Sequence, residues 1–166
     1  EAEIRFGIDT YGIVHHPQHG QIYAYETDGF GNYNLMDDAN VPSLLAMPYL
    51  GYCAPDDALY RNTRAFVLSE DNPYFFSGNY ASGIGSPHTD SGYVWHIGIT
   101  MQGLTSTDRA EQERLIDMLV TTTAGTNFMH ESFDPNDPAQ YSRSWFAWAN
   151  SLFAEFVLRW LETTAD

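Results

Sequence analysis

The stretch WFAWANSLFAEFVLRWL, residues 145–161, decides the fold class of this sequence. Its apolar side chains recur every three or four residues, which places them on one broad face of an α-helix. They are Trp145, Phe146, Trp148, Ala149, Leu152, Phe153, Phe156, Val157, Trp160 and Leu161. Ser151, Glu155 and Arg159 follow one another at intervals of four on the opposite face, in the order that favours a Glu–Arg ion pair. The strongest element of the chain is therefore predicted to be helical.

Three further helices are predicted from periodicity and capping signals. One begins near Asp56 as its N-cap and ends before Asn72. A second covers residues 94–104, and a third opens at 106 with the inner-face residues Leu115, Ile116, Leu119, Val120 and Thr123. Long loops between the helices carry the polar clusters. This pattern favours a mainly α array or toroid of helix pairs over a sheet fold.

Residues before position 56 give weaker signals. Residues 1–14 fit either a short helix or an irregular lead-in, and residues 21–36 predict a Tyr-rich β-hairpin with turn dipeptides between apolar flanks. Residues 40–52 predict a short helix, because Asn40 suits the N-cap and Pro42 suits the first turn.

The charge of the chain limits its partners. The 166 residues have a formal net charge of −15 and a sequence pI of about 4.4, and all seven basic residues are Arg. Nucleic acid is not an expected partner, because the sequence offers no basic surface for phosphates, and an anionic membrane is excluded for the same reason. Aromatic residues make up 15% of the chain. That fraction fits both a packed core and a sugar-binding cleft.

The chain has one cysteine, Cys53, so no internal disulfide is expected. Its apolar neighbours predict a buried filler rather than a nucleophile. No apolar run reaches the length of a membrane span, and no targeting segment is visible. We expect a soluble protein, and its compartment is unknown from the sequence.

Three histidines, His15, His16 and His19, lie close together in a predicted turn. Clustered imidazoles suggest a metal site, but Pro17 breaks a helix and no acidic or Cys partner stands at ligand spacing. We therefore expect no metal here and no cofactor elsewhere.

Two adjacent carboxylates, Asp37 and Asp38, precede the predicted helix at 40–52. Helix capping and an ion pair with Arg64 would explain them as structural residues. Backbone N–H groups beside two acids can also hold several hydroxyls of a polar ligand in fixed geometry. Both interpretations remain open from the residues alone.

Taken together, nine segments resemble glycoside hydrolase family 125, whose members are exo-acting α-1,6-mannosidases. The resemblance covers nearly the whole chain in order. The segments are residues 23–32, 36–45, 60–68, 72–75, 83–89, 103–106, 124–126, 129–133 and 145–153.

The resemblance implies an (α/α)6 toroid with a loop-built pocket at one end. It also implies inverting hydrolysis of a terminal α-1,6-linked mannose without a metal. Family members are much longer, so residues 1–166 correspond to the C-terminal portion of a single catalytic domain. The implied partners are an α-mannoside oligosaccharide or glycan and the N-terminal half of the toroid.

Inverting hydrolysis needs an acid that protonates the leaving oxygen and a base that activates water. The base of the family lies in a Met-His-Glu-Ser-Phe-like loop, which implies that Glu131 is the general base. The general acid of the family lies in an Arg-Pro-Ser-Asp-Asp-like segment upstream of the hairpin. This chain has no such segment, so the general acid is not in this chain.

Other polar and aromatic residues in the matching segments are candidates for sugar contacts. Arg64 and His88 either contact the sugar or orient a neighbouring carboxylate. His130 is expected to position Glu131. The full set of substrate-binding candidates is Asp37, Asp38, Arg64, His88, His130, Glu26 and Trp95.

A different class of function remains open. Because the general acid is missing, the chain also fits a non-catalytic mannose-binding module or a degenerate remnant.

Overall fold

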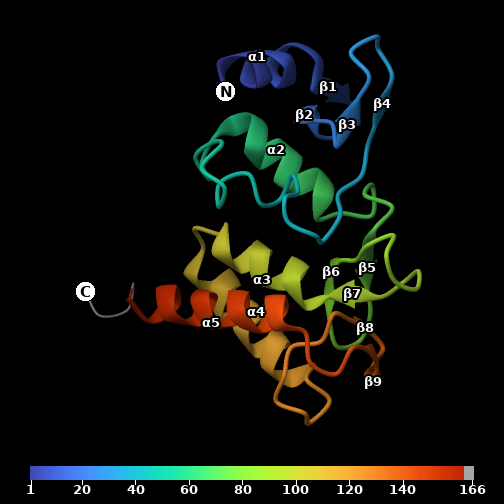
Figure 1. Ribbon diagram of the computed structural model, residues 1–166, viewed down its shortest axis with the longest axis vertical. Coiled ribbons are helices and arrows are strands. Elements are labelled where there is room, and N and C mark those ends of the chain that lie inside the picture. The colour runs from blue at the N-terminus through green and yellow to red at the C-terminus, as the bar shows by residue number, and fades with distance from the viewer. Residues whose placement is uncertain (163–166) are drawn as a thin grey trace.

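The computed structural model describes residues 1–162, and Figure 1 shows their arrangement. Within that range there are five α-helices and four small antiparallel sheets of two or three strands. The helices are the longest elements. No described helix combines the length and hydropathy needed to cross a membrane.

The N-terminal part forms a small layer at one end of the molecule (Figure 1). Helix α1 (Ala2–Tyr11) leads into the hairpin of β1 (Ile13–His16) and β2 (Gly20–Tyr23). A second antiparallel pair, β3 (Glu26–Thr27) with β4 (Tyr33–Asn34), follows. Tyr23 therefore pairs with Ile13 rather than within the hairpin predicted for 21–36, and only two residues of each later strand pair.

The helix predicted for residues 40–52 is wrong. The segment forms consecutive turns, with i to i+3 bonds such as Ala46 N–H to Ser43 O. Pro42 and Pro48 lack the N–H groups that an α-helix needs and leave too few residues between them for a stable helix. Asn40 is not a helix cap either, because its side-chain amide donates to Asp38 Oδ1.

Helix α2 (Ala58–Val67) begins one residue later than expected. Asp57, rather than Asp56, is the N-cap, and its carboxylate accepts the backbone N–H of Tyr60 at 3.0 Å. The inner face consists of Tyr60, Thr63, Phe66 and Val67. Phe66 and Val67 join the main core, and Tyr60 packs in a second cluster with Tyr23 and Met47.

Helices α3 (His96–Leu104), α4 (Arg109–Thr121) and α5 (Ala147–Glu162) pack together (Figure 1). Helix α3 packs tightly against α5 at Gly103, where an added Cβ would lie 2.1 Å from the Phe156 ring. A side chain at this position would therefore separate the two helices.

The apolar face of α5 is only partly covered within this chain. Ala149, Leu152 and Phe156 are its buried residues. Trp145, which precedes the helix, is 57% exposed, and Leu158 is 61% exposed. The periodicity identified the helix correctly, but it did not show how much of the face is buried.

The remaining strands lie beside α3 and carry the loops of the candidate site. Strands β5 (Phe75–Ser77) and β6 (Ser82–Ile84) pair with each other. Strand β7 (Val94–Trp95), predicted as helix, pairs with β8 (Ser132–Asp134), which pairs with β9 (Asp137–Ser142). This three-stranded sheet fixes the segment that begins at Glu131.

Candidate functional site

The carboxylate of Glu131 lies directly before β8 and is held from β9. Ser142 Oγ donates to Glu131 Oε2 at 3.0 Å, and Arg143 Nε lies 3.2 Å from the same oxygen. Because the hydroxyl proton of Ser142 is used on Glu131, Ser132 Oγ is the donor in the 2.7 Å contact between the two serines. The Glu131 side chain is 13% exposed, so it is held in place but still reached by solvent.

The backbone of Arg143 adopts φ 45°, a left-handed conformation that is uncommon outside glycine. Such a conformation costs roughly 1 kcal/mol or more and persists only where the surroundings impose it. Arg143 directly follows the last residue of β9, and its side chain contacts the Glu131 carboxylate from this position.

Two buried histidines support the backbone next to Glu131. The backbone N–H of His130 donates to Nδ1 of His96 at 2.9 Å. His96 Nδ1 is therefore unprotonated, so Nε2 carries the proton and donates to Thr122 Oγ1 at 3.0 Å. The His96 ring also stacks on Phe133 at 4.6 Å between centroids. The candidate base thus follows a residue whose backbone is bonded into the core.

Burial lowers the pKa of His96 to about 3, so this imidazole is neutral at physiological pH. The carbonyl oxygen of His130 lies 3.1 Å from His96 Nδ1 and favours the protonated ring, but burial outweighs it. A neutral His96 is the form that can accept the His130 N–H.

The side chain of His130 is fixed on both sides of its ring. Its nitrogens lie 3.0 Å from Ser144 O and 3.2 Å from Thr123 O, and Tyr141 stacks on it at 3.9 Å with the planes 3° apart. His130 is fully buried. This placement suits the expected role of positioning Glu131 and leaves the ring no surface for a direct sugar contact.

Asp37 is fully buried and organises the turns that replace the predicted helix. Its two carboxylate oxygens accept the N–H groups of Leu44 at 2.8 Å and Leu45 at 3.0 Å. Its own N–H donates to Asn72 Oδ1 at 3.1 Å. Burial raises the pKa of Asp37 to about 7, although the N–H donors act against the rise. Asp37 therefore has a structural role whatever else it contacts.

Asp38 faces a different group of side chains. Its Oδ1 accepts both the backbone N–H and the side-chain amide of Asn40, each at 3.0 Å. Its Oδ2 lies 3.9 Å from Nε2 of His88, whose side chain is 68% exposed. Ser86 Oγ joins the group by accepting from Asn40 Nδ2 at 3.2 Å and from the backbone N–H of His88. The sequence candidates Asp38 and His88 are thus brought together.

Trp95 connects this group to the Glu131 loop. Its indole N–H donates to Thr89 Oγ1 at 2.8 Å, and its backbone pairs with Ser132 in the β7–β8 ladder. The ring is 2% exposed and meets Phe146 edge to face. The expectation that Trp95 offers a flat face to a sugar does not fit this burial, because its ring is part of the core.

Two other candidates lie apart from these groups. Arg64 donates to the Glu111 carboxylate at 3.1 Å and to Gln102 O at 3.0 Å. The ion pair suggested for Arg64 is thus made with Glu111, not with Asp37 or Asp38. Glu26 is exposed on β3, where it accepts from Asn34 Nδ2 at 3.4 Å.

Two neighbouring cavities lie beside the segment that Asp37 organises. One of about 370 Å³ is lined by Tyr25, Glu26 and residues 42–44. A larger one of about 470 Å³ lies between α1 and residues 42–52 and has a mainly apolar lining. Sugar hydroxyls need polar partners, so the smaller cavity with Glu26 suits a sugar better than the larger one.

The chain matches the family described as metal-independent alpha-mannosidase (GH125) over residues 1–158. It belongs to this family of glycoside hydrolases. It is 52% identical over 161 residues to the Schizosaccharomyces pombe protein called meiotically up-regulated gene 157 protein, covering 96% of this chain and 32% of that protein.

A solved Streptococcus pneumoniae structure is also similar, with a TM-score of 0.95 and 53% identity over 97% of this chain and 38% of that chain. It is described as a metal-independent α-mannosidase in a non-productive substrate complex with α-1,6-mannobiose. The present chain therefore spans about a third of the length of both relatives.

Several residues around the site were not found from the sequence. Ser142 and Arg143 reach Glu131 only because β9 pairs with β8. His96 had no signal beyond being a histidine in an apolar segment. Asn72 was taken as the end of a helix, yet its buried side chain holds the backbone of Asp37. A turn rich in Asp and Pro at 134–138 was the one available sign of the β8–β9 return.

Proposed function

We propose that this chain forms part of an exo-acting mannosidase that removes a terminal α-1,6-linked mannose with inversion, and that Glu131 is its general base. The observation that carries the proposal is the Glu131 carboxylate, fixed by Ser142 and Arg143 at the start of β8 in a chain of the GH125 family. The S. pneumoniae relative supports the linkage, because its described complex contains α-1,6-mannobiose.

The contacts of Glu131 suit a base. Both side-chain donors approach Oε2, so Oε1 is the oxygen proposed to accept a proton from the attacking water. In an inverting mechanism the water attacks the anomeric carbon from the face opposite the leaving group. The bond to the leaving oxygen breaks as that oxygen takes a proton from the general acid, and the product is a β-configured mannose.

Asp38 and His88 are proposed to bind mannose hydroxyls, with Glu26 at the edge of the neighbouring cavity. The buried Asp38 carboxylate lies 3.9 Å from the His88 ring, and His88 is exposed enough to meet a ligand. Asp37 shapes the turns beneath this surface, and Trp95 supports the loop through Thr89. A sugar contact of Arg64 stays a prediction, which requires that its guanidinium also serve Glu111.

The general acid and the remaining helices of an (α/α)6 toroid are proposed to come from a further portion of the protein. The relatives are about three times as long as this chain. Several large apolar side chains are also exposed in this chain, among them Ile4 at 70% and Phe6 at 67% on α1. Exposed apolar side chains of this kind are typical of a surface that packs against another part of a protein.

The test is to follow the hydrolysis of the methyl glycoside of α-1,6-mannobiose, whose reducing-end mannose cannot change anomer, by the full-length protein with proton NMR. We expect β-mannose to appear first and the α-anomer to follow by mutarotation. Mannobioses with α-1,2 and α-1,3 linkages serve as matched controls and should react more slowly. Release of α-mannose first would refute inversion. Binding without hydrolysis would instead support a non-catalytic mannose-binding module.

A further inference from the structure

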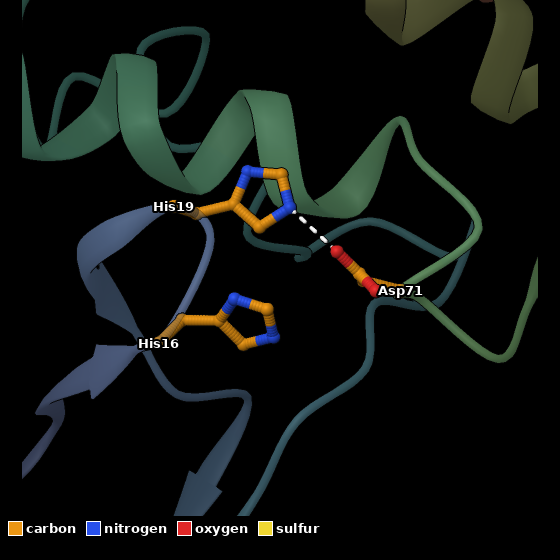
Figure 2. Close-up of side chains that lie close together, drawn as sticks. All are labelled: His16, His19 and Asp71. Atoms are coloured by element: carbon orange, nitrogen blue, oxygen red, sulfur yellow. Dashed lines mark hydrogen bonds and ion pairs between the residues drawn. The ribbon is translucent and has the colours of Figure 1, made fainter.

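A second cluster of side chains lies far from Glu131, at the opposite end of the molecule. His16 ends β1, His19 lies in the turn before β2, and Asp71 lies in the loop after α2. Figure 2 shows the three side chains gathered on one side of the hairpin. His19 Nε2 lies 2.8 Å from Asp71 Oδ2, and one potential ligand atom from each residue lies within 4.8 Å of the other two.

The cluster is built on a supported scaffold. The turn closes where His16 pairs with Gly20, whose φ of 74° is a left-handed conformation that glycine adopts at little cost. The two imidazole rings lie 4.9 Å apart, and both contact the fully buried ring of Phe66 on α2. Asn62 Nδ2 also donates to Gln21 O at 3.1 Å. The hairpin is thereby fixed against the helix that leads to Asp71.

The donor set identifies the kind of ion that fits. Two imidazole nitrogens and one carboxylate oxygen are a common three-residue ligand set for Zn²⁺, with water in the fourth position. Mg²⁺ and Ca²⁺ prefer oxygen ligands throughout, whereas imidazole favours the later transition metals. The two histidines are close in the sequence, but the carboxylate is not, because Asp71 is 52 residues from His19.

The distances require only a small closure. Metal–ligand bonds of about 2.1 Å in a tetrahedral site place ligand atoms roughly 3.4 Å apart. The present atoms lie within 4.8 Å of one another. The side chains of His19 and Asp71 are 15% and 31% exposed, so rotation of their side chains can bring the donors together. The 3.3 Å contact from Gln18 N–H to His16 Nδ1 would be exchanged for one to water.

We propose that His16, His19 and Asp71 bind one Zn²⁺ ion that clamps the β1–β2 turn to the loop after α2. Asp71 adjoins Asn72, whose buried Oδ1 accepts the N–H of Asp37. The ion would therefore stabilise the loop beneath the proposed sugar site. Figure 1 places β1–β2 and β8–β9 at opposite ends of the long axis, so the ion is not a reagent in a reaction at Glu131.

The test uses the full-length protein after removal of metal with a chelator. Native mass spectrometry after addition of Zn²⁺ should show one ion bound at this site, and added Co²⁺ should give visible absorption bands typical of a four-coordinate site. His16→Gln, His19→Gln and Asp71→Asn should each weaken Zn²⁺ binding by at least about tenfold. His15→Gln changes an exposed histidine on the same strand and is the matched control.

Thermal melting gives an independent readout. Zn²⁺ at about a hundredfold excess over its Kd should raise the Tm of the wild type and His15→Gln by several degrees but leave the three ligand variants unchanged. Melting in chelator shows that the variants are folded. Failure of the wild type to bind Zn²⁺, or binding that all three ligand variants retain, would overturn the proposal. Mannosidase turnover that disappears with the chelator at a temperature well below the Tm of the metal-free protein, but is retained by the three ligand variants, would overturn the structural role assigned to the ion.

Discussion

Replacing His96 with Phe tests whether the buried histidine supports the proposed base. The substitution keeps an aromatic ring beside Phe133 and so preserves the stacking contact. It removes the acceptor for the His130 N–H and the donor to Thr122 Oγ1. The Thr122 hydroxyl still donates to Met118 O, so the N–H of His130 is the group left without a partner.

The expected loss of stability comes from the unpaired N–H of His130. A buried N–H without an acceptor costs about 1–3 kcal/mol, and the retained ring avoids a cavity term. We therefore expect the free energy of unfolding at pH 7.5 to fall by about 1–3 kcal/mol, measured by urea denaturation. Because Glu131 follows the loosened residue, kcat on α-1,6-mannobiose should also fall.

The pH dependence of the free energy of unfolding tests the role of His96 more specifically. The folded-state pKa of His96 is lowered to about 3, below the ordinary histidine value of 6.5. Above pH 6.5 both states are neutral and the native contacts contribute fully. As the pH falls from 6.5 toward 3, the unfolded chain takes up a proton that the folded chain does not, and stability is lost. The whole window corresponds to about 5 kcal/mol.

The His96→Phe variant has no imidazole at this position, so it does not lose stability through this protonation. Its free energy of unfolding should decline less steeply below pH 6.5 than that of the wild type, and the two curves should cross between about pH 4 and pH 6. Thr122→Val is the comparison variant, because it leaves the His130 N–H bonded to His96. It should reduce stability but lower kcat less. A His96→Phe protein with wild-type stability, wild-type turnover and an unchanged dependence of stability on acid pH would show that His96 does not support the Glu131 loop.

Two further predictions concern the helix contact and the Glu131 loop. Gly103→Ala should lower the free energy of unfolding by about 1–2 kcal/mol in denaturant titration, because overpacking against Phe156 exceeds the gain in helix propensity. Phe156→Leu should relieve part of that loss in a double-mutant cycle, and simple additivity would contradict the close contact. Arg143→Gln should lower kcat on α-1,6-mannobiose several-fold with a stability change below about 1 kcal/mol, since the guanidinium is largely exposed. An unchanged kcat would show that Arg143 does not orient Glu131.

The helices were predictable where local periodicity and packing agree. Residues 147–162 and 109–121 form helices close to the expected ranges. The helix predicted for 40–52 is wrong although residues typical of a helix start are present. The Asp37 carboxylate accepts the N–H groups of Leu44 and Leu45, as a cap would, but turns follow instead of a helix. A capping residue accepts hydrogen bonds from free backbone N–H groups. Such N–H groups occur in turns as well as at the start of a helix, so a capping residue alone does not predict a helix.

The candidate site could be predicted only for residues that lie within one matching segment of the sequence. Glu131 was identified through the resemblance of residues 129–133 to a loop of the family, and its role as the base stays a prediction. Its partners Ser142 and Arg143 depend on strand pairing, and His96 depends on a contact 34 residues along the chain. The histidines at 15, 16 and 19 were considered as metal ligands and set aside, because the carboxylate of Asp71 is far away in the sequence and only folding brings it close.

The proposed role of Glu131 as the catalytic base of a mannosidase is tested most directly by replacing its carboxylate. Glu131→Gln keeps the size and the acceptor oxygen but removes the basic group. In the full-length protein it should lower kcat on α-1,6-mannobiose by about 10²–10⁴-fold. Its Tm should stay close to that of the wild type. Glu113→Gln, which changes an exposed acid on α4, should leave kcat unchanged. Normal turnover by Glu131→Gln would show that Glu131 is not the base.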